Sequence, residues 1–160
     1  MPWRPMIPAD LPAVIATAAL VHPEHPEDDA VLAERLALAP EGCLVLERSG
    51  AVLGYALSHP WAGPPPALNR LLGGVPARPQ AWYVHDLAIL PGARGGGEGA
   101  AGAALLLARA DGLGLPALLV AVSGSAPFWA RLGFRAVAAA GASYGADAVV
   151  MRREPSRGRG

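Results

Sequence analysis

A glycine-dense stretch between a predicted strand and a predicted helix has the composition of an anion-binding turn. It reads Arg94-Gly95-Gly96-Gly97-Glu98-Gly99, and it follows a strand pattern over residues 82–89 and precedes an Ala/Leu helix pattern over residues 100–110. Glycine leaves the backbone accessible, so several N–H groups at a helix N-terminus can bind a negatively charged group, which the helix dipole also favours. We therefore predict a phosphate-binding loop.

One histidine of the preceding strand has a side chain suited to proton transfer near neutral pH. Histidine has an unperturbed pKa of about 6.5, so its imidazole can take a proton from a reacting group such as an amine. Strict alternation places the strand residues on two faces, with Tyr83, His85, Leu87 and Ile89 on one and Trp82, Val84, Asp86 and Ala88 on the other. This pattern predicts that Asp86 points away from His85. The alternative for His85 is a purely structural hydrogen bond within the sheet.

The glycine stretch does not fit two common nucleotide-binding motifs. A Walker loop requires Gly-Lys followed by Ser or Thr, and the chain contains no lysine. Gly97, Gly99 and Gly102 spell GxGxxG, but the next strand pattern, residues 118–122, ends in Ser-Gly without the expected acid. A dinucleotide-binding enzyme is therefore the least favoured interpretation.

Three ordered segments resemble the GNAT acetyltransferase superfamily. Arg94, Gly97 and Gly99 form Arg-x-x-Gly-x-Gly, which is similar to the coenzyme A pyrophosphate loop of that family. Residues 127–135 read Pro-Phe-Trp-Ala-Arg-Leu-Gly-Phe-Arg, which resembles the family's aromatic pair followed by Leu-Gly-Phe. The strand of residues 82–89 is similar to the central strand of arylalkylamine-type members. The resemblance covers residues 82–137 strongly and the remainder by element order.

The resemblance implies an α+β, three-layer fold. Its sheet would be mixed and mostly antiparallel, with six or seven strands flanked by helices and a central parallel strand pair that splays apart. We expect one acetyltransferase domain over residues 1–152 and a disordered tail over residues 153–160.

The resemblance also implies the reaction, which is acetyl transfer from acetyl-CoA to a small-molecule primary amine by direct attack in a ternary complex, without a metal. His85 would be the base, acting directly or through water, and Tyr83 replaces a second histidine of the arylalkylamine-type strand. Trp129 stands where the family often has a tyrosine that protonates the leaving thiolate, so Tyr144 is the candidate acid. The residues implied to bind the coenzyme are Leu87, Ala88, Ile89, Arg94, Gly95, Gly96, Gly97, Glu98, Gly99, Ala100, Ser125 and Phe128.

Two alternatives remain for the function. One is an acyltransferase that uses a longer acyl-CoA. The other is a CoA-binding or regulatory domain with weak catalysis, which the replacement of tyrosine by Trp129 favours. The acceptor alternatives are a small amine, an amino acid, an antibiotic or a protein terminus.

Composition narrows the class of protein. The chain has 160 residues, of which 52% are hydrophobic, and this predicts one globular domain. A formal net charge of zero gives no support for nucleic-acid binding. We expect no membrane span and no signal peptide. The chain has a single cysteine, Cys43, and the absence of a possible internal disulfide favours a cytoplasmic location. We interpret Cys43 as a small core residue and not as a nucleophile. All basic residues are arginine and none is lysine, which indicates a GC-rich bacterial genome. The sequence does not decide between a monomer and a homodimer.

The other predicted elements frame this central part. A first helix follows Asp10 as its N-cap, and Ser125 is the expected N-cap of a late helix that ends at Gly133. We predict further strands over residues 3–6, 43–47, 51–58, 136–139 and 146–151, and a helix over residues 31–38. A polar loop, residues 22–29, and a Pro/Gly-rich loop, residues 60–79, are expected to border the acceptor pocket. The first holds two histidines and four acids, and its prolines favour a solvated loop over a metal site.

Overall fold

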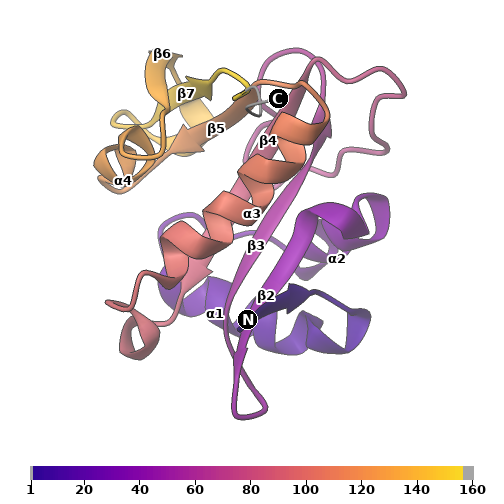
Figure 1. Cartoon of the computed structure of the whole chain (residues 1–160), viewed down its shortest axis with the longest axis vertical. Helices are drawn as coiled ribbons and strands as arrows, with labels where there is room; N and C mark the ends of the chain where they lie inside the picture. The colour runs from indigo at the N-terminus through magenta and orange to yellow at the C-terminus, as the bar shows by residue number, and fades with distance from the viewer. Residues whose placement is uncertain (1, 157–160) are drawn as a thin grey trace.

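A seven-stranded mixed sheet forms the centre of the molecule, as the sequence predicted (Figure 1). The computed structural model describes residues 2–156. The strands are β1 (Trp3–Pro5), β2 (Cys43–Arg48), β3 (Ala51–Trp61), β4 (Ala81–Ile89), β5 (Ala117–Ala121), β6 (Arg135–Ala139) and β7 (Val149–Arg153). Their order is β1-β2-β3-β4-β5-β7-β6, and every pair is antiparallel except β4–β5. The predicted fold class is confirmed.

Helices cover both faces of this sheet and make three layers (Figure 1). The helices are α1 (Leu11–Val21), α2 (Asp29–Leu38), α3 (Glu98–Gly112) and α4 (Ala126–Ala130), with 3-10 turns η1 (Pro8–Asp10), η2 (Pro40–Gly42), η3 (Pro91–Ala93) and η4 (Ala142–Tyr144). Leu106 and Leu107 of α3 belong to one core cluster with Trp82 of the sheet. Val14 of α1 and Leu32 of α2 belong to a second cluster on the other face.

Helix α3 approaches the sheet closely at one glycine. A Cβ atom on Gly102 would lie 2.5 Å from the ring of Trp3, which is buried. The same indole donates a hydrogen bond from Nε1 to the carbonyl of Glu98 at 2.9 Å. This contact fixes the N-terminal end of α3 relative to the sheet and thereby positions the glycine loop that precedes it.

The parallel strand pair diverges soon after it forms. The β4–β5 register contains three residue pairs and ends at Val84↔Leu119, whereas β4 continues to Ile89. The backbone of residues 85–89 is therefore not paired with β5 on that edge. This divergence is the splay that the resemblance implied.

A β-bulge lies at His85 and overturns the predicted alternation of β4. Leu57 pairs with Asp86, but the next residue of β3, Ser58, pairs with Val84, so His85 is the extra residue. A bulge shifts the side-chain parity of a strand by one residue. The prediction that Asp86 points away from His85 is therefore wrong, because both contact the segment that follows α1.

Asp10 and Ser125 are the N-cap residues of α1 and α4, as predicted, but within residues 2–156 neither side chain makes the expected capping hydrogen bond. Asp10 makes no capping bond to α1; its carboxylate instead accepts a hydrogen bond from the Ile7 N–H at 2.8 Å and pairs with Arg4. The Ser125 side chain makes no capping bond to α4 within the described part of the chain. Gly133 has a φ of +98°, which confirms the left-handed residue predicted there.

Two strands extend at least two residues beyond their predicted ends. Strand β3 continues through Pro60 to Trp61, because Pro60 still pairs with Trp82. Strand β7 includes Arg153, which had been assigned to the tail and which forms an ion pair with Asp111 at 2.8 Å. Residues 157–160 of the expected tail lie outside the described residues.

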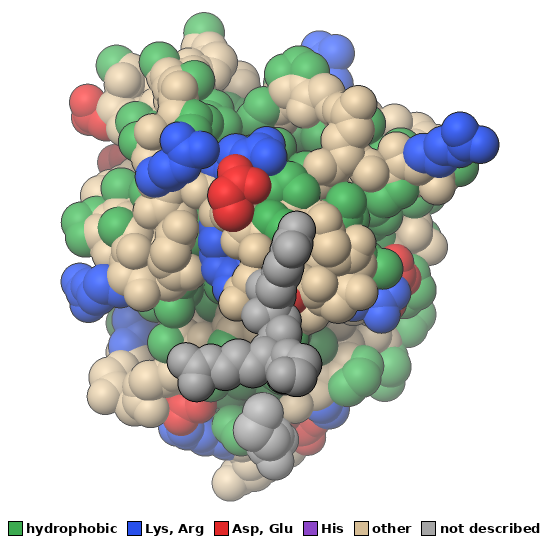
Figure 2. Space-filling model, turned by 45° about the horizontal axis from the view of Figure 1, so that its top comes forward, with side chains coloured by type: hydrophobic (Ala, Val, Ile, Leu, Met, Phe, Trp, Pro, Cys, Tyr) green, Lys and Arg blue, Asp and Glu red, His purple; other side chains and the backbone are tan. Residues whose placement is uncertain are grey.

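One face of the molecule carries charges of both signs (Figure 2), and the single cysteine is buried, as expected for a core residue. On the face drawn in Figure 2, arginine and acidic side chains are interspersed with hydrophobic and other groups. Cys43 is buried, and this burial raises the pKa of its thiol to about 12, so it is not an activated nucleophile. Within residues 2–156, no helix has both the length and the apolar character that a membrane span requires.

Candidate active site

A cavity of about 820 Å³ opens where β4 and β5 diverge. One part is lined by the end of β4, the glycine loop and α4, and the other part by the segment after α1. The predicted site residues that line it are His85, Leu87, Ala88, Ile89, Arg94, Gly95, Gly97, Glu98, Gly99, Ala100, Ser125, Phe128 and Tyr144. Gly96 and Tyr83, which were also predicted, are not among the lining residues. The structure thus brings most of the predicted site to one cavity.

The glycine loop exposes backbone N–H groups to this cavity. Gly95 and Gly97 have φ values of +99° and +78°, which lie in the left-handed region that favours glycine. Gly97 is the N-cap of α3, so the N–H groups of the first helical turn have no intrahelical partner. The Arg94 side chain turns back and donates from Nε to the Ile89 carbonyl at 2.9 Å. This geometry can bind a phosphate group.

The loop also contains an acid, Glu98, at the first position of α3. Its carboxylate forms an ion pair with Arg48 of the β2–β3 hairpin. A carboxylate beside a bound phosphate would be repulsive, and this pairing reduces its effect. Gly99 lies in the same turn, where a Cβ would be 3.6 Å from both Ile89 and Phe128, so the loop packs between the end of β4 and α4.

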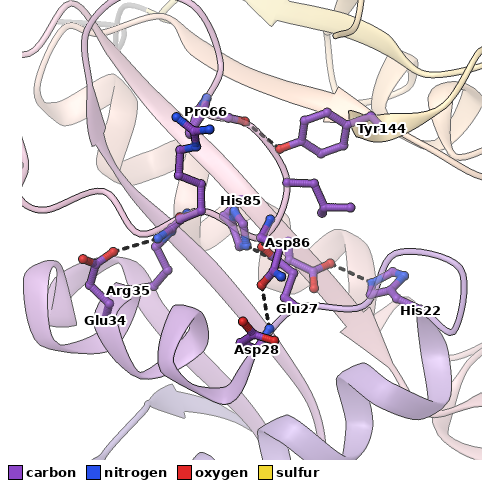
Figure 3. Close-up of polar contacts among 12 residues, drawn as sticks. His22, Glu27, Asp28, Glu34, Arg35, Pro66, His85, Asp86 and Tyr144 are labelled. Carbon is purple, nitrogen blue, oxygen red and sulfur yellow. Dashed lines mark hydrogen bonds and ion pairs between the residues drawn. The ribbon is translucent and has the colours of Figure 1, made fainter. Parts of the chain in front are cut away.

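The bulge residue His85 is paired with a carboxylate from a distant segment. Its Nε2 lies 2.7 Å from Glu27 Oε1, and the two residues are separated by 58 positions in the sequence (Figure 3). The side chains are 2% and 9% exposed, respectively. Burial acts to raise the pKa of Glu27, but the contact with His85 and the hydrogen bond from the Asn69 N–H together lower that pKa overall. His85 Nδ1 has no hydrogen-bond partner among the described residues.

The neighbouring residue, Asp86, makes a second acid–imidazole pair with the same loop. His22 Nε2 lies 2.8 Å from Asp86 Oδ1 (Figure 3). The Tyr55 hydroxyl donates a hydrogen bond to Asp86 Oδ2. Burial acts to raise the pKa of Asp86, but the hydrogen bonds from His22 and Tyr55 hold it below its usual range. Burial acts to lower the pKa of His22, but the contact with Asp86 raises it overall.

Two tyrosines lie beside these pairs. The Tyr144 hydroxyl donates a hydrogen bond to the Pro66 carbonyl at 2.8 Å (Figure 3). It also lies 3.5 Å from the Tyr83 hydroxyl. Burial raises the pKa of both phenols, so both keep their protons at neutral pH. His25 Nε2 lies 3.1 Å from the Tyr144 carbonyl. This end of the cavity is therefore enclosed by three segments that are far apart in the sequence.

Trp129 replaces a possible proton donor with an apolar ring. It lines the cavity, is 7% exposed, and packs edge-on against Phe128 and Phe134 with ring centroids 4.9 and 5.5 Å away. Its indole N–H is a hydrogen-bond donor but not an acid at physiological pH. Among residues 2–156, no group of three or more His, Cys, Asp or Glu side chains is placed to hold a metal ion.

Sequence reasoning missed His22 and Glu27 as members of the site. It correctly placed their loop beside the cavity, which His22, His25 and Glu27 all line. It expected a solvated loop, however, and the 9% exposure of the Glu27 side chain shows a buried acid there. The only local signal was the density of histidines and acids in that loop, and such a signal does not reveal which strand residues they meet.

Comparison with known proteins agrees with this geometry. Residues 12–134 match the acetyltransferase (GNAT) family. No curated protein matches the sequence. The fold is similar to the GphF GNAT-like decarboxylase in complex with isobutyryl-CoA, with a TM-score of 0.82 and 20% identity over 95% of this chain and 98% of that chain.

Two further solved structures are similar. The loading GNATL domain of CurA from Lyngbya majuscula has a TM-score of 0.78 at 15% identity, over 95% of this chain and 96% of that chain. Chaetomium thermophilum Naa20 in complex with a bisubstrate analogue has a TM-score of 0.75 at 19% identity, over 98% and 88%. The family match spans most of the chain and includes both the glycine loop and the bulged strand. The chain therefore belongs to the acetyltransferase (GNAT) family.

Proposed function

We propose that the protein transfers an acetyl group from acetyl-CoA to a primary amine by direct attack in a ternary complex. The observation that carries this proposal is the position of His85, a buried imidazole that lines the same cavity as the glycine loop. The similarity to Naa20, solved with a bisubstrate analogue, supports a cavity that accommodates donor and acceptor together. The arylalkylamine-type likeness of β4 stays a prediction.

The coenzyme would lie along the splayed strand. Its pyrophosphate would contact the N–H groups of residues 94–100 and the Arg94 guanidinium, and its pantetheine would pair with the β4 edge at residues 87–89. Ser125 and Phe128 would border it from α4. A backbone N–H near Leu87 would then stabilise the negative charge on the thioester oxygen in the transition state.

The reaction requires one proton to leave the amine and one to reach the sulfur. The amine nitrogen attacks the thioester carbon, the C–S bond breaks, and the electron pair leaves with the thiolate of CoA. His85 takes the proton of the amine, directly or through a water. Tyr144 is the candidate donor to the thiolate, with Tyr83 next to its hydroxyl.

The test is release of free CoA thiol from acetyl-CoA in the presence of a panel of primary amines, combined with calorimetry of coenzyme binding. We expect His85→Ala to bind acetyl-CoA like the wild type and to lose turnover. Faster release from longer acyl-CoAs would favour the alternative acyltransferase. Tight coenzyme binding with no turnover of any amine would favour the regulatory domain, and no binding of CoA or acetyl-CoA would refute the assignment.

A second candidate function is decarboxylation of a carboxylated acyl-CoA. The similarity to a GNAT-like decarboxylase and the presence of Trp129 both favour it. In such a reaction the C–C bond to the carboxylate breaks, CO₂ leaves, and the resulting enolate takes a proton, while the C–S bond stays intact. No acid for a leaving thiolate is then needed. Mass spectrometry of malonyl- and methylmalonyl-CoA incubated with the protein decides, because loss of CO₂ without thiol release identifies this activity.

A further inference from the structure

We propose that Glu27 is a positioning residue that fixes the tautomer of His85 and leaves Nδ1 as the proton acceptor. The proposal deepens the proposed function and rests on it for the role of that acceptor. It concerns a residue from a loop that sequence patterns assign to solvent.

The hydrogen bond between the two residues determines the tautomer. A carboxylate accepts hydrogen bonds and does not donate them, so we assign the proton of neutral His85 to Nε2, which lies 2.7 Å from Glu27 Oε1. The other ring nitrogen, Nδ1, then carries a lone pair. It has no hydrogen-bond partner among the described residues, although it is buried. The pair therefore leaves an unprotonated, buried nitrogen on a residue that lines the cavity.

Glu27 is itself held in place by a second loop. Its Oε2 accepts a hydrogen bond from the Asn69 N–H at 3.0 Å. The Asn69 side chain in turn accepts from the Asp28 N–H at 2.7 Å, and Asn69 has a φ of +57°. Each carboxylate oxygen of Glu27 thus accepts one hydrogen bond from the protein, which fixes the orientation of the group. This geometry suits a group that orients a catalytic side chain, as the carboxylate does in other acid–imidazole pairs.

Other titratable groups lie beside His85. They are Asp86 and Tyr83 on β4, His59 on β3 and Glu27 itself. Of these, only Glu27 makes a hydrogen bond with the His85 ring. Glu27→Gln therefore removes the carboxylate that is hydrogen-bonded to this ring.

The tautomer is measurable without any substrate. In protein labelled with ¹⁵N-histidine, the spectrum of neutral His85, assigned by its loss in His85→Gln, should show a proton on Nε2 and none on Nδ1. The isosteric variant Glu27→Gln should lose this preference, because an amide can both donate and accept. A wild-type His85 with its proton on Nδ1 overturns the proposal, whether or not any amine is acetylated.

Kinetics give the second test. We expect Glu27→Gln to lower kcat by about 100-fold or more, by comparison with the effect of a wrong tautomer in other acid–imidazole pairs. The KM for acetyl-CoA should stay within about twofold, because Glu27 orients a base and does not bind the donor. Glu24→Gln is the matched control, since Glu24 is an exposed acid on the same loop, and it should change neither quantity.

The outcomes separate the two levels of the proposal. A Glu27→Gln protein with unchanged tautomer and unchanged kcat overturns the positioning role and leaves the acetyltransferase assignment intact. A wild-type protein that releases no thiol with any amine refutes the assignment, and with it Nδ1 as the acceptor of an amine proton. A lower kcat with an unchanged KM for acetyl-CoA, together with a lost tautomer preference, supports both the positioning role and the acetyltransferase assignment.

Discussion

His22 Nε2 lies 2.8 Å from the carboxylate of Asp86, and this contact joins the end of α1 to the bulged part of β4. Burial acts to lower the pKa of His22, but Asp86 raises it overall, so the pair stabilises the fold most fully below the ordinary pKa of histidine. That contribution is lost as the pH rises through the higher pKa of the folded state. The pKa of Asp86 is lowered, so its contribution is present above the ordinary carboxylate range and is lost as the pH falls through the lower folded value.

The variant His22→Gln should therefore show a pH-dependent loss of stability. Near pH 6 we expect the free energy of unfolding to fall by about 1.5 to 3 kcal/mol, the range for hydrogen bonds to charged groups. The difference from the wild type should shrink toward about pH 9, where both proteins lack the imidazolium. Urea unfolding of both proteins at about pH 6 and about pH 9 measures the difference in the free energy of unfolding. The same difference at both pH values would contradict the ion-pair explanation.

Gly102→Ala should destabilise the protein, because its Cβ would lie 2.5 Å from Trp3. Overpacking of this kind costs about 1 to 3 kcal/mol. Gly112→Ala in the same helix is the matched control, since nothing lies within 4 Å of a Cβ there, and it should be neutral or slightly stabilising. Denaturant unfolding compares the two, and equal effects would show that Trp3 moves aside at little cost.

Arg94→Ala should weaken coenzyme binding. Loss of a charged contact to phosphate is expected to raise the Kd of CoA by about 10- to 100-fold, and binding should depend less on salt. Arg78→Ala is the control, because Arg78 is exposed on the long loop before β4. Calorimetry at two salt concentrations provides the measurement. An unchanged Kd would remove Arg94 from the proposed pyrophosphate contact.

Gly97→Ala should also weaken coenzyme binding, through the backbone. Gly97 has a φ of +78°, and a left-handed conformation costs a residue with a Cβ about 1 to 2 kcal/mol. Gly99→Ala makes ordinary contacts at 3.6 Å and should have a smaller effect on stability. If thermal unfolding ranks the two variants in the opposite order, backbone strain is not what defines this loop.

Tyr144→Phe distinguishes the two candidate reactions. If a thiolate leaves, loss of the donor should lower kcat by about 100-fold, as for other general acids. Decarboxylation leaves the C–S bond intact and should be affected much less. Thiol release and CO₂ loss by the same variant provide the comparison, with Tyr83→Phe as a control that keeps the Tyr144 hydroxyl and its bond to Pro66. Full thiol release by Tyr144→Phe would show that the thiolate leaves without this acid.

Local sequence patterns determined the order of elements and the part of the cavity that the glycine loop lines. Alternating apolar residues predicted β4, the glycines predicted an anion-binding turn, and an Ala/Leu run predicted α3. All of these depend on backbone preferences and side-chain periodicity within a few residues, which a linear sequence displays directly. The family resemblance rested on the same segments.

Only the tertiary structure decided which side chains meet where β4 contacts the segment after α1. The bulge at His85 arises from the register between β3 and β4, so it is a property of two strands and has no signal in either one alone. It places His85 and Asp86 toward the same loop, where Glu27 and His22 lie some sixty residues earlier in the chain. Periodicity is a property of one strand, whereas register is a property of a strand pair. The sequence therefore identified the His85 imidazole, but only the structure identified the Glu27 carboxylate that pairs with it.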